Sequence, residues 1–192
     1  MRTAEAIARA TSSWFRRQRQ LITQTGTRRA YGATATFATE LTEALVNSYL
    51  AGLKAAKAPA DRAEEALAQA KSHAQELARQ VQDATANMLA ADRPLGEVFG
   101  SDRAAAIGVQ EDNVARQRCL GIAAKVRGNG LRWETDGKPC KHCKPLAGKV
   151  VRPGEAFAID ANGQPVYHAP FHKFCRCKCV EVNLSTNRKI RA

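Results

Sequence analysis

The sequence predicts an α+β protein in which a mainly helical N-terminal body precedes a small C-terminal module of loops and short β-strands. Helical hydrophobic periodicity extends over the first two thirds of the chain. From Leu131 onward the pattern changes to Gly, Pro and β-prone runs, and this stretch contains five of the six cysteines. With 192 residues, 44% of them apolar, the chain is long enough for one domain core and a smaller annex.

Two helices are expected in the first 60 residues. Ile7, Trp14 and Leu21 recur every seven residues, which predicts a helix from about Glu5 to Leu21. A break over residues 25–29 precedes a second helix, which Ala58-Pro59-Ala60 ends. Its apolar residues are spaced by four: Phe37, Leu41, Leu45 and Tyr49.

A third helix is expected to begin at Asp61, which can cap it, and to form an antiparallel hairpin with the second. It carries a heptad seam of small and apolar residues: Leu67, Ala70, Ala74, Leu77, Val81, Ala84 and Met88. The seam is interpreted as intramolecular core, and the alternative is a partner protein's helix. Residues 1–100 therefore form a helical region for oligomerisation or for binding a partner.

A fourth helix is expected to begin at Ser101 or Asp102 and to run toward Gly128. Its predicted buried residues are Ile107, Val114, Ile122 and Val126. The adjacent Glu111 and Asp112 are interpreted as part of a solvated helix face. The helix opens a second region, residues 101–192, whose segment 131–182 is the cysteine-rich module.

Two segments of this module have the spacing of a metal site. Cys140 and Cys143 form a C-x2-C knuckle, and His172 and Cys175 form an H-x2-C pair about thirty residues later. A tetrahedral zinc ion needs four nitrogen or sulfur ligands, so the sequence predicts a structural Zn2+ site that staples the module. Its predicted ligands are Cys140, Cys143, His172 and Cys175. Cys177 is the alternative to Cys175, because Cys175, Cys177 and Cys179 would face one side of a strand.

The sequence also allows other states of the cysteines and histidines. Disulfides or unligated thiols are the alternatives to a metal site. Cys119, on the fourth helix, is expected to be a small buried residue rather than a ligand. His168 is expected to make a hydrogen bond or to lie at the surface, and His142 to face solvent.

The charge is strongly basic and unevenly distributed. The net charge is +12, and residues 125–192 carry fourteen Lys or Arg against five Asp or Glu, or +9. Such an excess predicts binding to a polyanion such as DNA, although a generic solubilising surface is the alternative. The predicted nucleic-acid-binding residues flank the cysteines: Lys138, Lys141, Lys144, Lys149, Arg152, Lys173, Arg176 and Lys178.

The sequence predicts no catalytic residues and no enzymatic activity. Four good protein ligands favour a closed metal site, whereas a catalytic zinc keeps one open position. The nearest acidic residues lack motif spacing to the ligands: Glu134, Asp136, Glu155 and Asp160. Apolar runs of a few residues predict no membrane span, and residues 1–10 lack a signal-peptide core, so the chain is expected to be soluble and unexported.

Residues 104–182 resemble a known family, the phage head morphogenesis or minor head proteins of the phage Mu F type. The helix around residues 107–115 looks like the family's Ile-Ala-x-Thr-Glu helix, and Trp133 and Asp136 precede the Cys140–Cys143 knuckle. Leu146-Ala-Gly148 follows, and residues 170–177 resemble the family's closing Pro-x-His-Pro-x-Cys-Arg-Cys. Gln110 and Lys173 stand where the family usually has threonine and proline.

The resemblance implies a phage minor head (head morphogenesis) structural protein, present in the virion and in the host cytoplasm during assembly. The implied partners are the portal or major capsid protein and the packaged double-stranded DNA, with homo-oligomers also expected and no membrane. The alternative from another class is a zinc-containing DNA-binding regulatory protein. A metal-dependent nuclease is the third interpretation.

Overall fold

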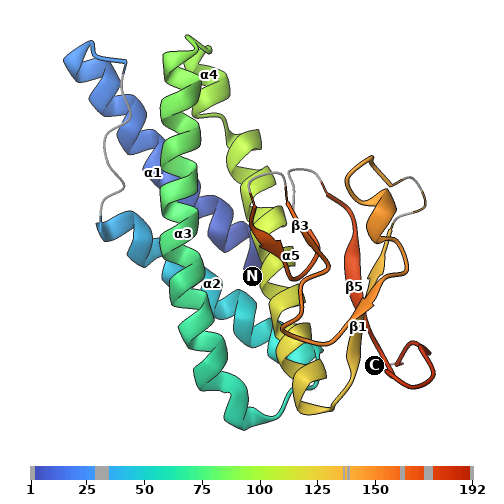
Figure 1. Cartoon of the computed structure of the whole chain (residues 1–192). Coiled ribbons are helices and arrows are strands. Elements are labelled where there is room, and N and C mark those ends of the chain that lie inside the picture. The colour runs from blue at the N-terminus through green and yellow to red at the C-terminus, as the bar shows by residue number, and fades with distance from the viewer. Residues whose placement is uncertain are drawn as a thin grey trace. The chain divides into compact units, whose positions relative to one another are not determined.

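The computed structural model describes residues 3–28, 35–135, 137, 139–160, 163–170 and 175–190. The protein is mainly helical and ends in a small region of strands and loops that contains the cysteine cluster (Figure 1). This is the fold class that the sequence predicts. No helix in the described part of the chain is both long enough and apolar enough to cross a membrane.

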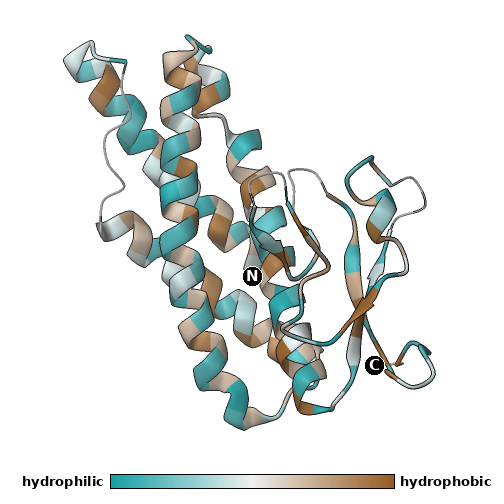
Figure 2. Ribbon diagram, in the orientation of Figure 1, coloured by the Kyte–Doolittle hydropathy of each residue, from teal (hydrophilic) through white to brown (hydrophobic). Residues whose placement is uncertain are grey.

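All four predicted helices are present. The first is longer than predicted, whereas the third begins at Ala63, two residues after the predicted start at Asp61, which lies in a 3-10 turn. Apolar and polar residues alternate around the helical ribbons, as expected for helices with one buried side (Figure 2). The helical elements are α1 (Thr3–Thr25), α2 (Ala35–Ala55), the 3-10 turn η1 (Ala60–Arg62), α3 (Ala63–Ala90), the one-turn α4 (Leu95–Val98) and α5 (Ser101–Val126).

The chain packs into two compact units, and each long helix after α1 contributes to both. The first unit contains residues 1–48 and 67–112, and the second contains residues 49–66 and 113–192. These are packing units and not separate stretches of sequence. The predicted boundary near residue 100 and the predicted hairpin of the second and third helices stay predictions.

The core of the first unit is aromatic where α1 meets α2. The rings of Trp14 and Phe37 stack with centroids 4.9 Å apart, and both side chains are fully buried. Phe15 meets Phe99 edge to face at 5.8 Å. Gly108 on α5 allows a close approach to α1, because a Cβ atom there would lie 2.4 Å from the carbonyl oxygen of Ala4.

The predicted heptad seam on α3 is correct in its middle and wrong toward its C-terminal end. Ala70, Ala74, Leu77 and Val81 are buried, but Ala84 is exposed and Thr85 is buried in its place. A straight α-helix has 3.6 residues per turn, so its buried stripe drifts away from a strict seven-residue repeat. On α5 the prediction that Val126 is buried is also wrong, because this last helical residue is 41% exposed.

The interpretation of Glu111 and Asp112 as a solvated face is wrong. Glu111 is only 13% exposed, and its Oε2 lies 2.8 Å from Nε2 of the buried His73 on α3. Asp112 accepts a hydrogen bond from the hydroxyl of Thr3. Both acidic residues therefore bind partners within the first unit.

The second unit contains a three-stranded antiparallel sheet with the order β2-β1-β5. The central strand β1 (Gly130–Glu134) pairs with β2 (Val150–Val151) on one side and with β5 (Lys178–Val182) on the other. A two-stranded ribbon, β3 (Ala158–Ile159) and β4 (Pro165–Val166), lies between β2 and β5 in the sequence. The β-prone runs at residues 149–151 and 179–182 are thus confirmed as strands.

Trp133 is the centre of this unit's core. Its indole is fully buried and meets Phe157 edge to face, with ring centroids 5.1 Å apart at 71°. Leu131, Leu146 and Val151 belong to the same cluster, as do Cys143, Cys177 and Cys179. The cysteines are therefore part of the small apolar core that holds this unit together.

Candidate metal centre

The first half of the site is a tight turn between β1 and β2. The backbone N–H groups of Cys143 and Lys144 both donate to the carbonyl oxygen of Cys140, at 3.1 and 2.9 Å. A short 3-10 turn, η2 (Lys144–Leu146), follows and buries Leu146. This hydrogen bonding folds the C-x2-C sequence back on itself, so that Cys143 points inward, 1% exposed, while Cys140 stays at the surface.

The second half precedes β5, and the strand register brings it to the first. In the antiparallel β1–β5 pair Glu134, the last residue of β1, lies opposite Lys178, the first residue of β5. Cys177 therefore lies beside the point where the chain leaves β1 for the knuckle. Two residues earlier, Cys175 is half-buried and reaches the same place.

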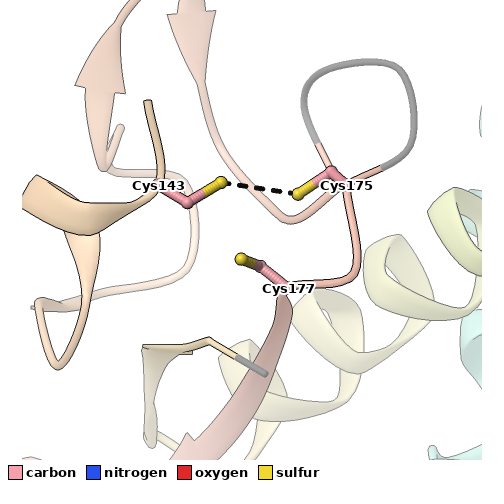
Figure 3. A group of neighbouring side chains, drawn as sticks. All are labelled: Cys143, Cys175 and Cys177. Carbon is pink, nitrogen blue, oxygen red and sulfur yellow. Dashed lines mark hydrogen bonds between the residues drawn. The ribbon is translucent and has the colours of Figure 1, made fainter. Parts of the chain in front are cut away.

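Three sulfur atoms converge there (Figure 3). The Sγ atoms of Cys143, Cys175 and Cys177 all lie within 4.8 Å of one another, and those of Cys143 and Cys175 are 3.5 Å apart. Cys140 is exposed and lies near Cys143, outside the group of three. These cysteines could hold a metal ion.

All six cysteines are described, and none is in a disulfide. Burial raises the pKa of the Cys143 thiol, and hydrogen bonds with Cys177, Cys175 and Cys140 raise it further. Burial also raises the pKa of Cys177, while hydrogen bonds with Cys143 and with the Trp133 indole act in the opposite direction. Without a cation these groups are therefore thiols at neutral pH, and a bound metal ion would favour their thiolate forms.

The remaining candidate ligands have other roles or positions. Cys179 is buried, its Sγ accepts a hydrogen bond from the Ala169 N–H at 3.4 Å, and burial raises its pKa to about 12. Cys119 is fully buried, as predicted, and its pKa is likewise raised to about 12 by burial. His168 accepts a hydrogen bond from Nε of Arg118 at 3.1 Å, and His142 is exposed. His172 lies outside the described residues.

The structure thus brings together two of the four predicted ligands, Cys143 and Cys175, together with Cys177, and it places Cys140 nearby. Sequence reasoning gave Cys177 only as a substitute for Cys175, whereas both sulfurs reach the cluster. The feature of the sequence that indicates both ligands is the spacing of Cys175 and Cys177, two residues apart just before a β-prone run. Trp133 was noted in the sequence only through the family resemblance, yet it forms one wall of the site.

Six of the eight predicted nucleic-acid-binding residues lie in the described part of the chain. The described ones are all exposed: Lys141, Lys144, Lys149, Arg152, Arg176 and Lys178. Lys138 and Lys173 lie outside the described residues. Lys149 also has a structural contact, since its Nζ donates to the carbonyl oxygen of Phe157.

Comparison with known proteins adds no relative. No protein-family model matches the chain. No curated protein and no solved structure matches it either.

Proposed function

We propose that this chain is a structural, non-enzymatic minor head protein of a phage, whose C-terminal module is held together by a structural zinc ion. The observation that carries the proposal is the convergence of the Cys143, Cys175 and Cys177 sulfurs beside Cys140. The proposed ligands are these four cysteines, with Cys177 in the place first given to His172.

The spacing of the sulfurs supports zinc. Tetrahedral thiolates at a Zn–S distance of about 2.3 Å have sulfur atoms about 3.8 Å apart. The observed 3.5 Å between Cys143 and Cys175, and the 4.8 Å limit for the group, bracket that value. When bound there, zinc would supply folding free energy to a unit whose apolar core is small.

The donor set supports a structural rather than a catalytic role. Four thiolates complete a tetrahedron, and a closed tetrahedron has no position for a substrate or a reactive water. Within the described residues the metal-capable group consists of three cysteines, and the nearby Cys140 would supply the fourth thiolate. This argues against the metal-dependent nuclease that the sequence left as a third interpretation.

The assignment to a phage head rests on the resemblance of residues 104–182 to the minor head family. In the second unit the knuckle, the Leu146-Ala-Gly148 segment and the closing Cys175-Arg176-Cys177 contribute to one compact site. Exposed lysines and arginines around the site suit a protein beside packaged DNA, because phosphates release counterions when such side chains bind them. The proposed partners are accordingly the portal or major capsid protein and the DNA.

The test combines metal content with location. Plasma mass spectrometry of the purified chain should find about one zinc per chain. The chain should also be found, with portal and capsid proteins, in purified phage particles. Metal-loaded protein that is absent from particles would instead favour the DNA-binding regulatory alternative, and metal-free protein would remove the basis of the module.

Variants at the cysteines sharpen the metal test. Cys143→Ser should release the metal and unfold the C-terminal module, because one thiolate is removed from the centre of the site. Cys119→Ala is the matched control, since this buried thiol on α5 is not in the cluster. Full metal retention in Cys143→Ser would contradict the ligand set.

A further inference from the structure

We propose that one face of the β1–β5 pair is a contact surface for the phosphate backbone of duplex DNA, formed by Arg132, Lys178 and Lys189. Two of these residues, Arg132 and Lys189, were not among the basic residues that the sequence singled out. The inference rests on the proposed DNA-facing role, and it names the surface that performs it.

The strand register places the charges on one face. Residues directly opposite in an antiparallel pair share a face, and here Arg132 is opposite Val180 and Glu134 is opposite Lys178. The other face carries Leu131, Trp133, Cys179 and Glu181, which are all buried. The first face carries Arg132 and Glu134, 24% and 26% exposed, and the exposed Lys178, whereas Val180 and Val182 on the same face are buried.

The segment after β5 adds Lys189 to this face. Asn183 forms the turn, its side-chain oxygen accepting hydrogen bonds from the N–H groups of Ser185 and Thr186 at 3.0 Å. The chain then returns, so that Lys189 bridges to Val182 and its Nζ lies 3.7 Å from Oε2 of Glu134. Arg132 fastens the same turn by donating to the carbonyl oxygen of Asn187 at 3.1 Å.

Within the described part of the chain, Glu134 is the acidic residue at the centre of this group. Arg132 Nη2 lies 3.0 Å from its Oε1, and the positive charges of Lys189, Arg132 and Lys178 all act on its carboxylate. Burial raises the pKa of Glu134, but these neighbours outweigh burial and hold it below the ordinary value. Among the residues that the structure describes, three cations thus share a single carboxylate, which is a local excess of two positive charges.

This excess distinguishes the group from a structural ion pair. On the buried face, Glu181 is matched by the one cation Arg127, with no charge left over. On the face of Glu134 the charges do not balance, and Lys189 is 51% exposed. A repeating anion such as a DNA strand can satisfy several closely spaced cations at once, whereas the single carboxylate of Glu134 cannot.

The experiment measures binding of the full chain to a mixed-sequence DNA duplex as a function of salt. Lys178→Gln and Lys189→Gln should each weaken binding and reduce the slope of log K against log salt by about 0.9. Glu134→Gln should have the opposite effect, because it removes the carboxylate that competes with phosphate, and should tighten binding severalfold at low salt.

Matched controls carry the same changes in net charge on α3. Lys71 and Glu76 are exposed there, and Glu76 pairs with its helix neighbours Arg79 and Gln80. Lys71→Gln and Glu76→Gln should leave affinity and salt slope close to wild type. If they change binding as much as the sheet variants do, net charge explains the effect and the surface assignment is overturned.

Failure of the inference is distinguishable from failure of the proposed function. If the wild-type protein binds DNA and its affinity is unchanged by Lys178→Gln, Lys189→Gln and Glu134→Gln, this surface is overturned. The DNA-facing role then still stands. Wild-type protein that binds polyglutamate but not duplex DNA overturns both. Circular dichroism and metal content of each variant establish that it is folded.

Discussion

Arg127 binds both carboxylate oxygens of Glu181, with its Nε 2.7 Å from Oε1 and its Nη2 on Oε2. The same guanidinium donates to the carbonyl oxygen of Ala56 at 3.0 Å, and Asn129 donates to Glu181 at 2.6 Å. The residues just after α5 thereby connect the end of α2 to strand β5 within the second unit. This network makes the stability of the unit depend on one buried carboxylate.

The first prediction concerns the pH dependence of that carboxylate. Burial raises the pKa of Glu181, but hydrogen bonds from Arg127 and Asn129 outweigh burial, so its folded-state pKa lies below the ordinary value. A carboxyl with a lowered folded pKa stabilises the fold above its unfolded pKa, near 4.3, and loses this contribution as pH falls through the folded pKa. Glu181→Gln should therefore cost about 1 to 2 kcal/mol of unfolding free energy at pH 7.

Denaturant unfolding of the wild type and of Glu181→Gln from pH 7 to pH 3 checks this. The difference between them should be constant down to about pH 5 and should shrink below it. Glu76→Gln, which alters an exposed helix residue, should stay within about 0.5 kcal/mol of wild type at neutral pH. A Glu181→Gln difference that grows as pH falls would contradict the prediction.

The second prediction concerns the close contact between α2 and α5 in the second unit. A Cβ atom on Gly52 would lie 2.9 Å from Sγ and 3.0 Å from Cβ of Cys119, and 3.3 Å from Cα of Arg116. Gly52→Ala should therefore overpack the contact and destabilise the unit by about 1 to 3 kcal/mol. Gly96→Ala is the control, because no atom lies within 4 Å of its added Cβ. Thermal unfolding measures both, and an unchanged melting temperature for Gly52→Ala would show that the helices separate at no cost.

The third prediction concerns Arg103, a largely buried cation in the first unit. Both its terminal nitrogens donate to Oγ1 of Thr85 at 3.1 Å, and the guanidinium stacks over the Phe15 ring at 4.8 Å. Burial lowers its pKa. Thr85→Val removes the hydroxyl acceptor while keeping a β-branched shape, so it should lower the unfolding free energy by about 1 to 3 kcal/mol.

Thr23→Val is the matched control for this variant. The hydroxyl of Thr23 is exposed and donates only to the carbonyl oxygen of Arg19, one turn earlier. Its loss should change stability by less than about 0.5 kcal/mol. Equal effects of the two substitutions in urea unfolding would show that the contact between Thr85 and Arg103 contributes nothing.

The fourth prediction concerns Cys177 and His172. The sequence predicts His172 as a ligand, and the proposed four-cysteine site has Cys177 instead. Cys177→Ser should release the metal, because the Cys177 sulfur belongs to the converging group. His172→Ala should retain it if the four cysteines are the ligands. The metal content of both variants after dialysis decides between the two ligand sets. Loss of metal from His172→Ala, with retention in Cys177→Ser, would restore the Cys3His set.

Much of the fold could be predicted because it depends on local periodicity. The seven-residue spacing predicts the buried side of α1 correctly at Ile7 and Trp14, which are fully buried, but Leu21 is exposed and Ile22 is buried in its place. The errors lie where tertiary contacts decide. Nothing in the local sequence shows that Glu111 on α5 meets His73 on α3, because the two residues are 38 positions apart.

The residue types of the candidate site could be predicted from the sequence, but the full set of cysteines that converge there could not. Cysteine spacing identified both halves of the site. The inclusion of Cys177 depends on β5 beginning at Lys178 opposite Glu134, and strand register is set by long-range pairing. The contact of Lys189 with Glu134 likewise depends on the turn after β5, which the sequence analysis did not address.

X-ray absorption at the zinc edge of the zinc-loaded full chain tests the central claim most directly. The four-cysteine site predicts a first shell of four sulfur atoms at about 2.3 Å. A shell that contains nitrogen at about 2.0 to 2.1 Å would contradict it and would return a histidine to the site.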